Sequence, residues 1–596
     1  MKFGRRIAAA AAAAVLALTA AIGSVSPAVQ AADDTNDDWL HAVGSRLYDK
    51  DGNEVWLTGA NWFGLNCTEY ALHYLWSGDI DDMVKSIGDR GINVIRVPVS
   101  TELLYDWMIG NPPDMVSVNP NTDPNYRINA DLVREDGTVM NSQEAFNVFL
   151  AKCKKYGIKV FIDIHCQDAD NAGHNYGLWY GKSFTDTNGK TVECTTEVWT
   201  ETLAWTADYY KNDDTLLGFD LKNEPHSKYG GAPIDAIWDD STAPNNWKLA
   251  AQNCALAIME KNPNALIFIE GVEGYEGHGA WWGGNLRGVK DHPVDIGKYQ
   301  SQIVYSPHDY GPIVSAQTWF EKDFTEQTLL DDYWYDTWAY VNDKDIAPLL
   351  IGEWGGRITD SVDEAALLET PSNSLTDLEK NVKWLILLRN YMIKNHINHT
   401  FWCLNDDSGD TGGLWKNIMF HGGPDANYTE VEWDELKYSI FKPSLWQTME
   451  TGKFIGLDHQ TALGENGISL GEYYASYADS EGSNLATAGR TDPIELETTA
   501  PTPTESPTAA PTEAAPTEAA TQGGQLSVTR WGDADDDGDT DIIDVISVNK
   551  DQLGSLNLSA QGWLNADVDC DGQLRFTDSV YIMQSLVELV ELPVTK

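Results

Sequence analysis

Two glutamates in short motifs carry the first chemistry that the sequence suggests. Glu224 lies in LKNEP (221–225) and Glu353 lies in IGEWG (351–355). Each motif follows an apolar run typical of a buried parallel strand, so each carboxylate is expected where a strand meets solvent. Hydrolysis of a glycosidic bond requires such a pair: one carboxyl donates a proton, and the other attacks or activates water. A surface residue or half of a structural ion pair is the alternative for either glutamate, and it is less favoured because the pattern occurs twice.

The fold that would hold these carboxylates is indicated by eight apolar or β-branched runs that end in polar or aromatic residues. They span residues 55–63, 92–99, 160–165, 217–224, 266–273, 303–310, 349–353 and 400–405. Helical patterns, such as 81–87 and 378–393, lie between most of them. This spacing predicts an α/β fold, a (β/α)8 TIM barrel, whose functional residues gather at the C-terminal ends of the strands. The residues at those ends are Arg96, His165, Asn223, Glu224, His308, Tyr310, Glu353 and Trp402.

Composition limits the classes of partner. The 596 residues carry a formal charge of −51, so nucleic acid and anionic membrane are not expected as partners. The 23 tryptophans fit a carbohydrate groove, because indole stacks on the apolar face of a sugar, although core packing is expected to account for more than half of them. Seven cysteines without CxxC spacing argue against a disulfide framework or a zinc ribbon and leave one or two bridges open.

The chain divides into four predicted segments. Residues 1–31 have a basic start, an Ala-rich apolar stretch and small residues before the expected cleavage point, as in a secretory signal of bacterial type. No later run is long enough to span a bilayer, so an extracellular location is expected. Residues 33–485 form the expected catalytic barrel, and 486–525 are a Pro/Thr/Ala/Glu linker. Residues 526–596 form a small second domain.

The small domain contains an internal repeat of two acidic loops, offset by 34 residues and each followed by a helical pattern. Both loops place acids at positions 1, 3, 5 and 12 with Gly at 6, the spacing at which oxygens converge on calcium. An acidic solvated turn is the weaker alternative. The predicted Ca²⁺ ligands are Asp533, Asp535, Asp537, Asp539, Asp541 and Asp544 in the first loop, and Asp567, Asp569, Asp571, Gln573 and Asp578 in the second.

Taken in order, the residues at the strand ends resemble the conserved set of glycoside hydrolase family 5, of the cellulase-A type. The stretches NWFG (61–64), HYLW (73–76), WWGGNL (281–286) and SGDTGG (408–413) resemble its endoglucanase-rich subfamily. The resemblance covers about residues 40–420 and provides no account of the residues from there to Tyr477.

The resemblance implies a role for each matched residue. Glu224 would be the general acid/base and Glu353 the nucleophile of a retaining enzyme that needs no cofactor for catalysis. The pKa of Glu224 is expected to be high in the free enzyme and to fall once Glu353 is esterified. Around these two, the expected substrate-binding set is Arg96, His165, Asn223, His308, Tyr310, Trp402, Trp62 and His73. Within this set, Arg96 and Tyr310 would hold Glu353 ionised, and Trp402 would lie under the sugar.

The loop–helix duplication resembles a dockerin, an all-α calcium-binding module that attaches enzymes to the cohesin domain of a scaffoldin. Two departures are Arg575 at position 9 of the second loop and Asp in place of Glu at position 12 of both. Together the two resemblances imply a secreted endo-β-1,4-glucanase that acts on cellulose and related β-glucans within a cellulosome-like complex, including one on the cell surface. A β-mannanase or xyloglucanase of the same family remains open, as does a non-catalytic carbohydrate-binding scaffold component. For the small domain, a plain calcium-stabilised cap remains open.

Overall fold

The structure is a computed structural model that describes residues 37–485, apart from 122 and 124, and much of 528–594. In the latter range it omits 537, 539, 541, 553–557, 571–573, 587–589 and 591. The predicted signal (1–31) and linker (486–525) lie outside the described residues. The chain separates into two units near residue 498, which are described here one at a time. None of the helices in the described part combines the length and the apolar character that a membrane span requires.

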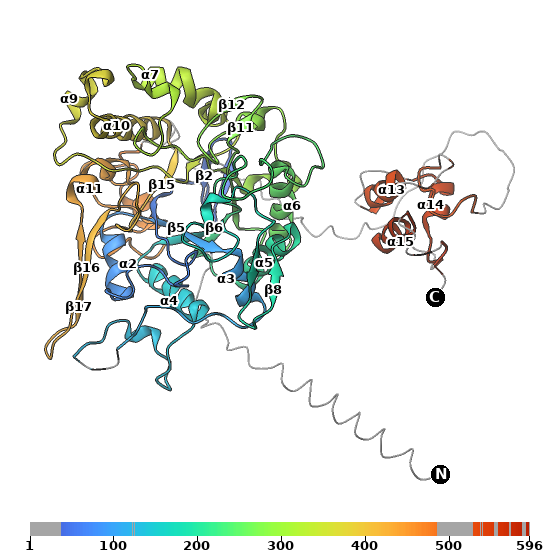
Figure 1. Cartoon of the computed structure of the whole chain (residues 1–596), viewed down its shortest axis with the longest axis horizontal. Helices are drawn as coiled ribbons and strands as arrows, with labels where there is room; N and C mark the ends of the chain where they lie inside the picture. The colour runs from blue at the N-terminus through green and yellow to red at the C-terminus, as the bar shows by residue number, and fades with distance from the viewer. Residues whose placement is uncertain are drawn as a thin grey trace, which may run out of the picture. The chain divides into compact units, whose positions relative to one another are not determined.

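A barrel of parallel strands forms the centre of the first unit (Figure 1). Its strands are β4 (Thr58–Asn61), β5 (Val94–Ser100), β6 (Lys159–Cys166), β9 (Leu216–Asp220), β10 (Leu266–Ile269), β13 (Ile303–Tyr305), β14 (Leu350–Ile351) and β15 (Asn398–Phe401). They pair in the order β13-β10-β9-β6-β5-β4-β15-β14, and a parallel bridge between Tyr305 and Leu349 joins the two ends. The predicted (β/α)8 barrel is therefore confirmed, and each of the eight strands overlaps one of the predicted runs.

Helices cover the outside of the barrel. The main ones are α2 (Ile80–Asp89), α3 (Thr101–Met108), α4 (Ser142–Lys155), α5 (Thr196–Tyr209), α6 (Trp247–Met259) and α10 (Asp377–Asn395), with a π-helix at Leu330–Ala339 between α7 (Glu326–Leu329) and α8 (Tyr340–Asp343), and α9 (Glu364–Glu369) before α10. Capping residues fix where several begin: the Asn141 and Thr376 side chains each take part in a reciprocal capping box with a glutamate. The two helical patterns expected from the sequence correspond to α2 and α10.

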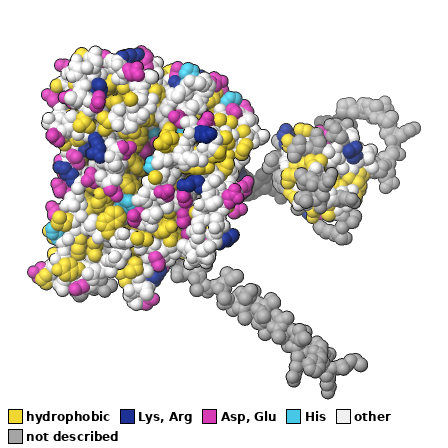
Figure 2. Space-filling view, viewed as in Figure 1, with side chains coloured by type: hydrophobic (Ala, Val, Ile, Leu, Met, Phe, Trp, Pro, Cys, Tyr) yellow, Lys and Arg dark blue, Asp and Glu magenta, His cyan; other side chains and the backbone are white. Residues whose placement is uncertain are grey.

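Short two- and three-stranded sheets lie outside the barrel. The N-terminal one is β1 (His41–Val43), β2 (Arg46–Tyr48) and β3 (Glu54–Val55); the others are the hairpins β7 (Ser183–Thr185) with β8 (Thr191–Glu193), β11 (Gly274–Tyr275) with β12 (His278–Gly279), and β16 (Trp415–His421) with β17 (Tyr428–Trp433). Figure 1 shows β16 and β17 as a long hairpin beside α2 and α11 (Glu435–Phe441). Acidic side chains are spread over the visible face of this unit rather than gathered in one patch (Figure 2).

The segment after α11 closes the N-terminal end of the barrel. Trp446, Ile455 and Leu470 share a buried apolar cluster with strand residues such as Val94 and Phe161. The helix α12 (Leu470–Ser476) contributes to the same cluster through buried Tyr473. Packing against the barrel floor is thus the structural role of the tail that the sequence did not explain.

The second unit holds α13 (Ile542–Gln552), α14 (Ala560–Ala566) and α15 (Phe576–Leu586) around a small core that includes Val548, Val568 and Ile582. It is all-α in its described residues, with one helix after each acidic loop, as predicted. All seven cysteines of the chain are free thiols, six of them buried, so the bridges that the sequence left open do not form.

Candidate active site

The two glutamates of the sequence motifs meet at the C-terminal end of the barrel. Glu224 lies four residues beyond β9, and Glu353 lies two residues beyond β14. One oxygen of each carboxylate and one ring nitrogen of His308 all lie within 4.8 Å of one another. The side chains remain 13% and 5% exposed, respectively. They form a close, largely desolvated pair that a substrate can still reach.

Arg96 and Tyr310 hold the Glu353 carboxylate from two sides. Arg96 Nη1 donates to Oε1 at 2.8 Å, and the Tyr310 hydroxyl donates to Oε2 at 2.7 Å. Burial alone would lower the pKa of Arg96, but the carboxylates around it raise that pKa well above its usual value. The guanidinium is completely buried and stays charged, so its part is to orient Glu353 rather than to touch a substrate.

Three further buried carboxylates surround Arg96. Asp163, Asp220 and Glu270 lie 3.2, 2.9 and 3.2 Å from its Nη2. Burial raises the pKa of Asp163 and of Asp220 to about 7, although Arg96 acts in the opposite direction. Burial also raises the pKa of Glu270, but its contact with His308 opposes this, and His308, whose own pKa is raised well above its usual value, holds the proton of this pair. These three residues of the site were not predicted from the sequence. Their signal was an acid inside or directly after an apolar strand run, where burial requires a partner.

Glu224 has an unusual backbone and two polar neighbours. Its φ is +51°, in the left-handed region, and its N–H donates to Glu270 Oε2 at 2.7 Å. His308 Nδ1 lies 3.1 Å from Glu224 Oε1. Burial would lower the pKa of His308, but Glu270 and Glu353 raise it well above its usual value, so the ring is cationic.

The predicted high pKa of Glu224 in the free enzyme is wrong. Burial raises that pKa, but the contact with cationic His308 outweighs burial and holds it below its usual value. Repulsion from Glu353 would raise the pKa of Glu224, but the His308 charge compensates for it.

A row of rings lies beside the carboxylates. The Trp402 indole is parallel to the His165 ring at 5.5 Å between centroids and to the Phe63 ring at 5.6 Å. Its N–H donates to Ser408 Oγ at 3.1 Å, so the SGDTGG segment fixes the orientation of the indole. Asp163 Oδ2 lies 2.7 Å from His165 Nδ1 and fixes that ring in turn. Trp402 is half-buried, so part of its indole is accessible for a ring to stack on.

The structure places the other predicted binding residues as follows. Asn223 is buried next to Glu224, and its Oδ1 accepts from Arg96 Nη2 at 3.1 Å. His73 is buried, with Nδ1 2.7 Å from Asp407 Oδ2 and its ring against Phe63. Its burial leaves little of the ring for a substrate to contact.

Trp62 is a correction to the predicted set. It is fully buried, its indole meets Phe149 and Trp415 edge to face, and its N–H donates to the His73 carbonyl. It cannot contact a substrate. Because side chains alternate along a strand, Asn61 and Phe63 face the barrel axis and the rim, and Trp62 faces the outer layer. The same alternation could have identified Phe63, which the sequence analysis did not select.

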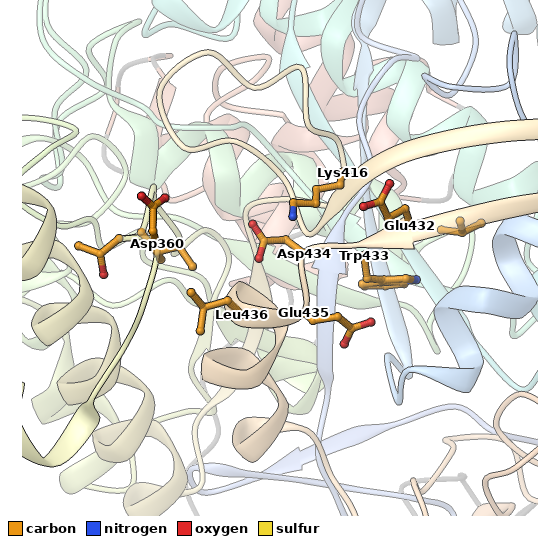
Figure 3. A pocket seen from close by; sticks show the side chains of 10 residues that line it. Asp360, Lys416, Glu432, Trp433, Asp434, Glu435 and Leu436 are labelled. Atoms are coloured by element: carbon orange, nitrogen blue, oxygen red, sulfur yellow. The ribbon is translucent and has the colours of Figure 1, made fainter.

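A separate cleft of about 480 Å³ lies between residues 358–360 and the junction of β17 with α11 (Figure 3). Lys416 and several acids, among them Asp360 and Glu432, line it. Neither Glu224 nor Glu353 borders it, so it is not the catalytic cleft.

The two acidic loops of the second unit repeat one contact. Asp544 Oδ1 accepts from the N–H groups of Ala534 and Asp535 at 2.6 and 3.2 Å. In the second loop, Asp578 Oδ1 accepts from Val568 and Asp569 at 3.1 and 3.4 Å. Position 12 therefore closes both loops in the same way. Of the other predicted ligands, Asp533 and Asp567 are buried, and Asp537, Asp539, Asp541, Asp571 and Gln573 lie outside the described residues.

The donor chemistry of these loops fits a hard cation. Burial and the neighbouring acids Asp569 and Asp567 raise the pKa of Asp578, as expected of carboxylates that repel one another without a counter-charge. Arg575, the departure at position 9, is exposed, and its backbone N–H donates to Asp578 Oδ2 at 2.9 Å.

Comparison with known proteins places the barrel in a family. A family model described as cellulase (glycosyl hydrolase family 5) matches residues 48–408. Endoglucanase G and Endoglucanase B of Acetivibrio thermocellus are 52% and 45% identical over 503 and 472 residues, covering 80% and 73% of this chain and 83% and 77% of those proteins. A solved complex of an endocellulase from Pyrococcus horikoshii with cellotetraose has a TM-score of 0.54 at 28% identity, covering 68% of this chain and 98% of that one.

Proposed function

The chain belongs to glycosyl hydrolase family 5, and from that membership we propose that it is a secreted endo-β-1,4-glucanase acting on cellulose and related β-glucans. The observation that carries the proposal is the cluster of Glu224, Glu353 and His308 at the barrel mouth. One oxygen of each carboxylate and one ring nitrogen of His308 lie within 4.8 Å of one another. The names of the relatives support the substrate class: they are endoglucanases, and one solved relative was crystallised with cellotetraose. A major extracellular endoglucanase of Xanthomonas campestris, 27% identical over 408 residues, supports secretion.

We propose a retaining double displacement. Retention needs carboxyl groups about 5–5.5 Å apart so that one can reach the anomeric carbon directly, whereas inversion leaves about 6.5–9.5 Å for a water molecule. Oxygens of Glu224 and Glu353 within 4.8 Å support the shorter spacing. Glu353 would attack the anomeric carbon while Glu224 protonates the leaving oxygen. Water, deprotonated by Glu224, would then release the sugar from Glu353.

The neighbours of the two carboxylates divide the work. Arg96 donates to one carboxylate oxygen of Glu353, and Tyr310 donates to the other. Each oxygen retains a lone pair that can attack the anomeric carbon. Asn223 precedes Glu224 and bonds Arg96, which also holds Glu353, and its amide can bind the sugar 2-hydroxyl there. Cationic His308 lowers the pKa of Glu224, so the protonated form that can donate to the leaving oxygen is abundant only at acidic pH. The proposal therefore includes an optimum on the acidic side of neutrality.

Two separate groups of aromatic rings lie near the site, which supports binding within a chain rather than at its end. Trp402 and Phe63 lead to His73, whose ring lies 5.0 Å from that of Trp76, 38% exposed. On the Glu224 side, the Trp282 ring stacks on His226 at 3.9 Å, and the exposed Tyr229 ring lies 5.3 Å from it. Subsites on both sides of the cleaved bond are what endo action needs.

For the second unit we propose a dockerin that binds Ca²⁺ and a scaffoldin cohesin, which would attach the enzyme to a cellulosome-like complex, including one at the cell surface. The repeated closure by Asp544 and Asp578 supports two equivalent loops. The predicted loop acids would hold Ca²⁺, which would neutralise their mutual repulsion and stabilise the fold. Binding of a cohesin only in the presence of Ca²⁺ is the expected result, and a unit that binds Ca²⁺ but no cohesin would be the plain cap.

An activity panel tests the catalytic proposal: carboxymethyl-cellulose, mixed-linkage glucan, xyloglucan and mannan, each with wild type and Glu224→Gln. A rapid fall in viscosity of carboxymethyl-cellulose that the variant abolishes is the expected result. Activity confined to mannan or xyloglucan would retain the mechanism and replace the substrate. If wild type hydrolyses none of them, the non-catalytic alternative is favoured.

A further inference from the structure

Glu270 is a buried carboxylate that contacts the proposed acid/base from two directions. It directly follows β10 and is 0% exposed. Its Oε2 accepts the Glu224 backbone N–H at 2.7 Å. Its Oε1 lies 3.1 Å from His308 Nε2, at ion-pair distance, and the other ring nitrogen of His308 contacts the Glu224 carboxylate at 3.1 Å. Glu270 thus touches Glu224 directly at the backbone and indirectly, through His308, at the side chain.

The backbone contact matters because Glu224 has φ of +51°, which is unfavourable for a residue with a Cβ. A carboxylate acceptor for its N–H stabilises that conformation. Gly283 makes room for the arrangement: a Cβ at this position would overlap Glu270 Oε2 and lie 3.1 Å from Glu224 Cα. The Glu270 backbone is itself fixed, since its carbonyl accepts from the Trp247 indole N–H at 2.8 Å.

We propose that Glu270 is a positioning residue for Glu224, holding its left-handed backbone and keeping His308 protonated so that His308 Nδ1–H donates to the Glu224 carboxylate. This inference rests on the proposed function. The charged or titratable groups that face Glu270 are His308, Arg96, Asp220, Lys222 and Glu224. Among them His308 is the one that also contacts the Glu224 side chain, so it transmits the effect of Glu270 to the acid/base.

Glu270→Gln changes the charge with little change in shape. The Glu224 N–H still needs an acceptor, so in the variant the side-chain amide oxygen occupies the position of the wild-type Glu270 Oε2. The amide NH₂ group then faces His308 Nε2. That contact favours a neutral His308 protonated at Nδ1. Glu224 then loses a cation at hydrogen-bond distance, and its ionised form becomes less stable. Its pKa rises by about 1 unit, the lower end of the range for losing an adjacent opposite charge.

The test measures kcat/KM against pH for wild type and Glu270→Gln on two aryl β-cellobiosides, one with a poor and one with a 2,4-dinitrophenyl leaving group. Active sites are counted with a 2-deoxy-2-fluoro cellobioside that esterifies the nucleophile without acid assistance, so misfolded protein does not enter the rates. The alkaline limb reports loss of the Glu224 proton in the free enzyme and should move up by about 1 pH unit. On the pH-independent plateau below the alkaline limb, kcat/KM should fall about 10-fold or more with the poor leaving group and less than about 3-fold with dinitrophenyl.

Two controls separate positioning from stability. Asp214→Asn removes another buried carboxylate, at the opposite end of the barrel beside Lys159. Its kcat/KM per titrated active site should depend on pH as that of wild type does. Gly283→Ala displaces Oε2 and also strains its own backbone, where φ is +67°, and its titrated active sites should show the leaving-group dependence of Glu270→Gln. The inference would be overturned if the alkaline limb of Glu270→Gln lay at the same pH as that of wild type and kcat/KM fell equally for both substrates. That result would leave the proposed function intact. Inactive wild type would instead refute the proposed function and, with it, the premise of this inference.

Discussion

His459→Asn should loosen the segment that closes the floor of the barrel. His459 Nδ1 lies 2.5 Å from Asp38 Oδ1, and Nε2 lies 3.0 Å from Asp49 Oδ2. On the other side of Asp38, buried Lys159 of β6 lies 2.8 Å from Oδ2. One ion network therefore joins the N-terminal strands, the barrel and the tail beyond the family match, which ends at residue 408.

The size of the effect follows from the His459 ring. Burial would lower the pKa of His459, but Asp38 and Asp49 outweigh it and raise the pKa from 6.5 to about 10. Without screening this displacement corresponds to about 5 kcal/mol below pH 6.5 and to about 4 kcal/mol at pH 7. The ring is partly exposed and solvent reaches Asp51 nearby, so we expect about 1–2 kcal/mol. Since the folded-state pKa is raised, the stabilisation is complete below pH 6.5 and is lost as pH rises through about 10.

Urea unfolding followed by tryptophan fluorescence measures this difference at several pH values. The gap in unfolding free energy between wild type and His459→Asn should be greatest near pH 6 and should close by about pH 10. His292→Asn, which removes a histidine paired with exposed Asp240, is the matched control and should leave the midpoint unchanged. A gap that does not vary with pH would refute the electrostatic account and assign the loss to packing.

Three further predictions concern the site and the second unit. Tyr310→Phe removes the hydroxyl that donates to Glu353 at 2.7 Å and should lower kcat/KM about 10- to 100-fold, the equivalent of one hydrogen bond to a charged group. Tyr340→Phe is the control, because the Tyr340 hydroxyl donates to the Leu286 carbonyl, and it should leave kcat/KM unchanged. Equal losses of kcat/KM in both variants would contradict the role given to Tyr310. Trp62→Ala should cost about 3–5 kcal/mol of stability because it empties a core position, with KM of the folded enzyme unchanged; a raised KM at unchanged stability would restore Trp62 to the substrate site. Removal of Ca²⁺ by a chelator should reduce the helical circular dichroism of the second unit and leave hydrolysis of soluble glucan intact, and unchanged helicity would argue against calcium in the loops.

The sequence was informative where one local rule decides the outcome. The ends of the strands were predictable because apolar runs stop where the chain leaves the barrel, and this placed Glu224 and Glu353 at one rim. Arg96, predicted at the same rim, instead lies inside β5, where it is completely buried. Trp62 was placed wrongly because residue type was weighed above strand alternation, which turns it outward and Phe63 inward.

Other features depend on contacts between distant segments, which no local pattern encodes. The His308 charge that lowers the pKa of Glu224 requires Glu270 and Glu353 from two other strands. The tail from Trp446 to Tyr473 packs on strand residues more than 200 positions away in sequence, such as Val94 and Phe161, so its place on the barrel floor could not be read from its own composition.

The central claim is that Glu353 attacks the anomeric carbon directly while Glu224 supplies the proton, as their spacing supports. The most direct test is ¹H NMR of the reducing-end product in the first minutes of hydrolysis of a cello-oligosaccharide, before mutarotation. Double displacement predicts that the β-anomer appears first and then equilibrates. Initial release of the α-anomer would mean that water attacks in a single step, and it would contradict the role given to Glu353.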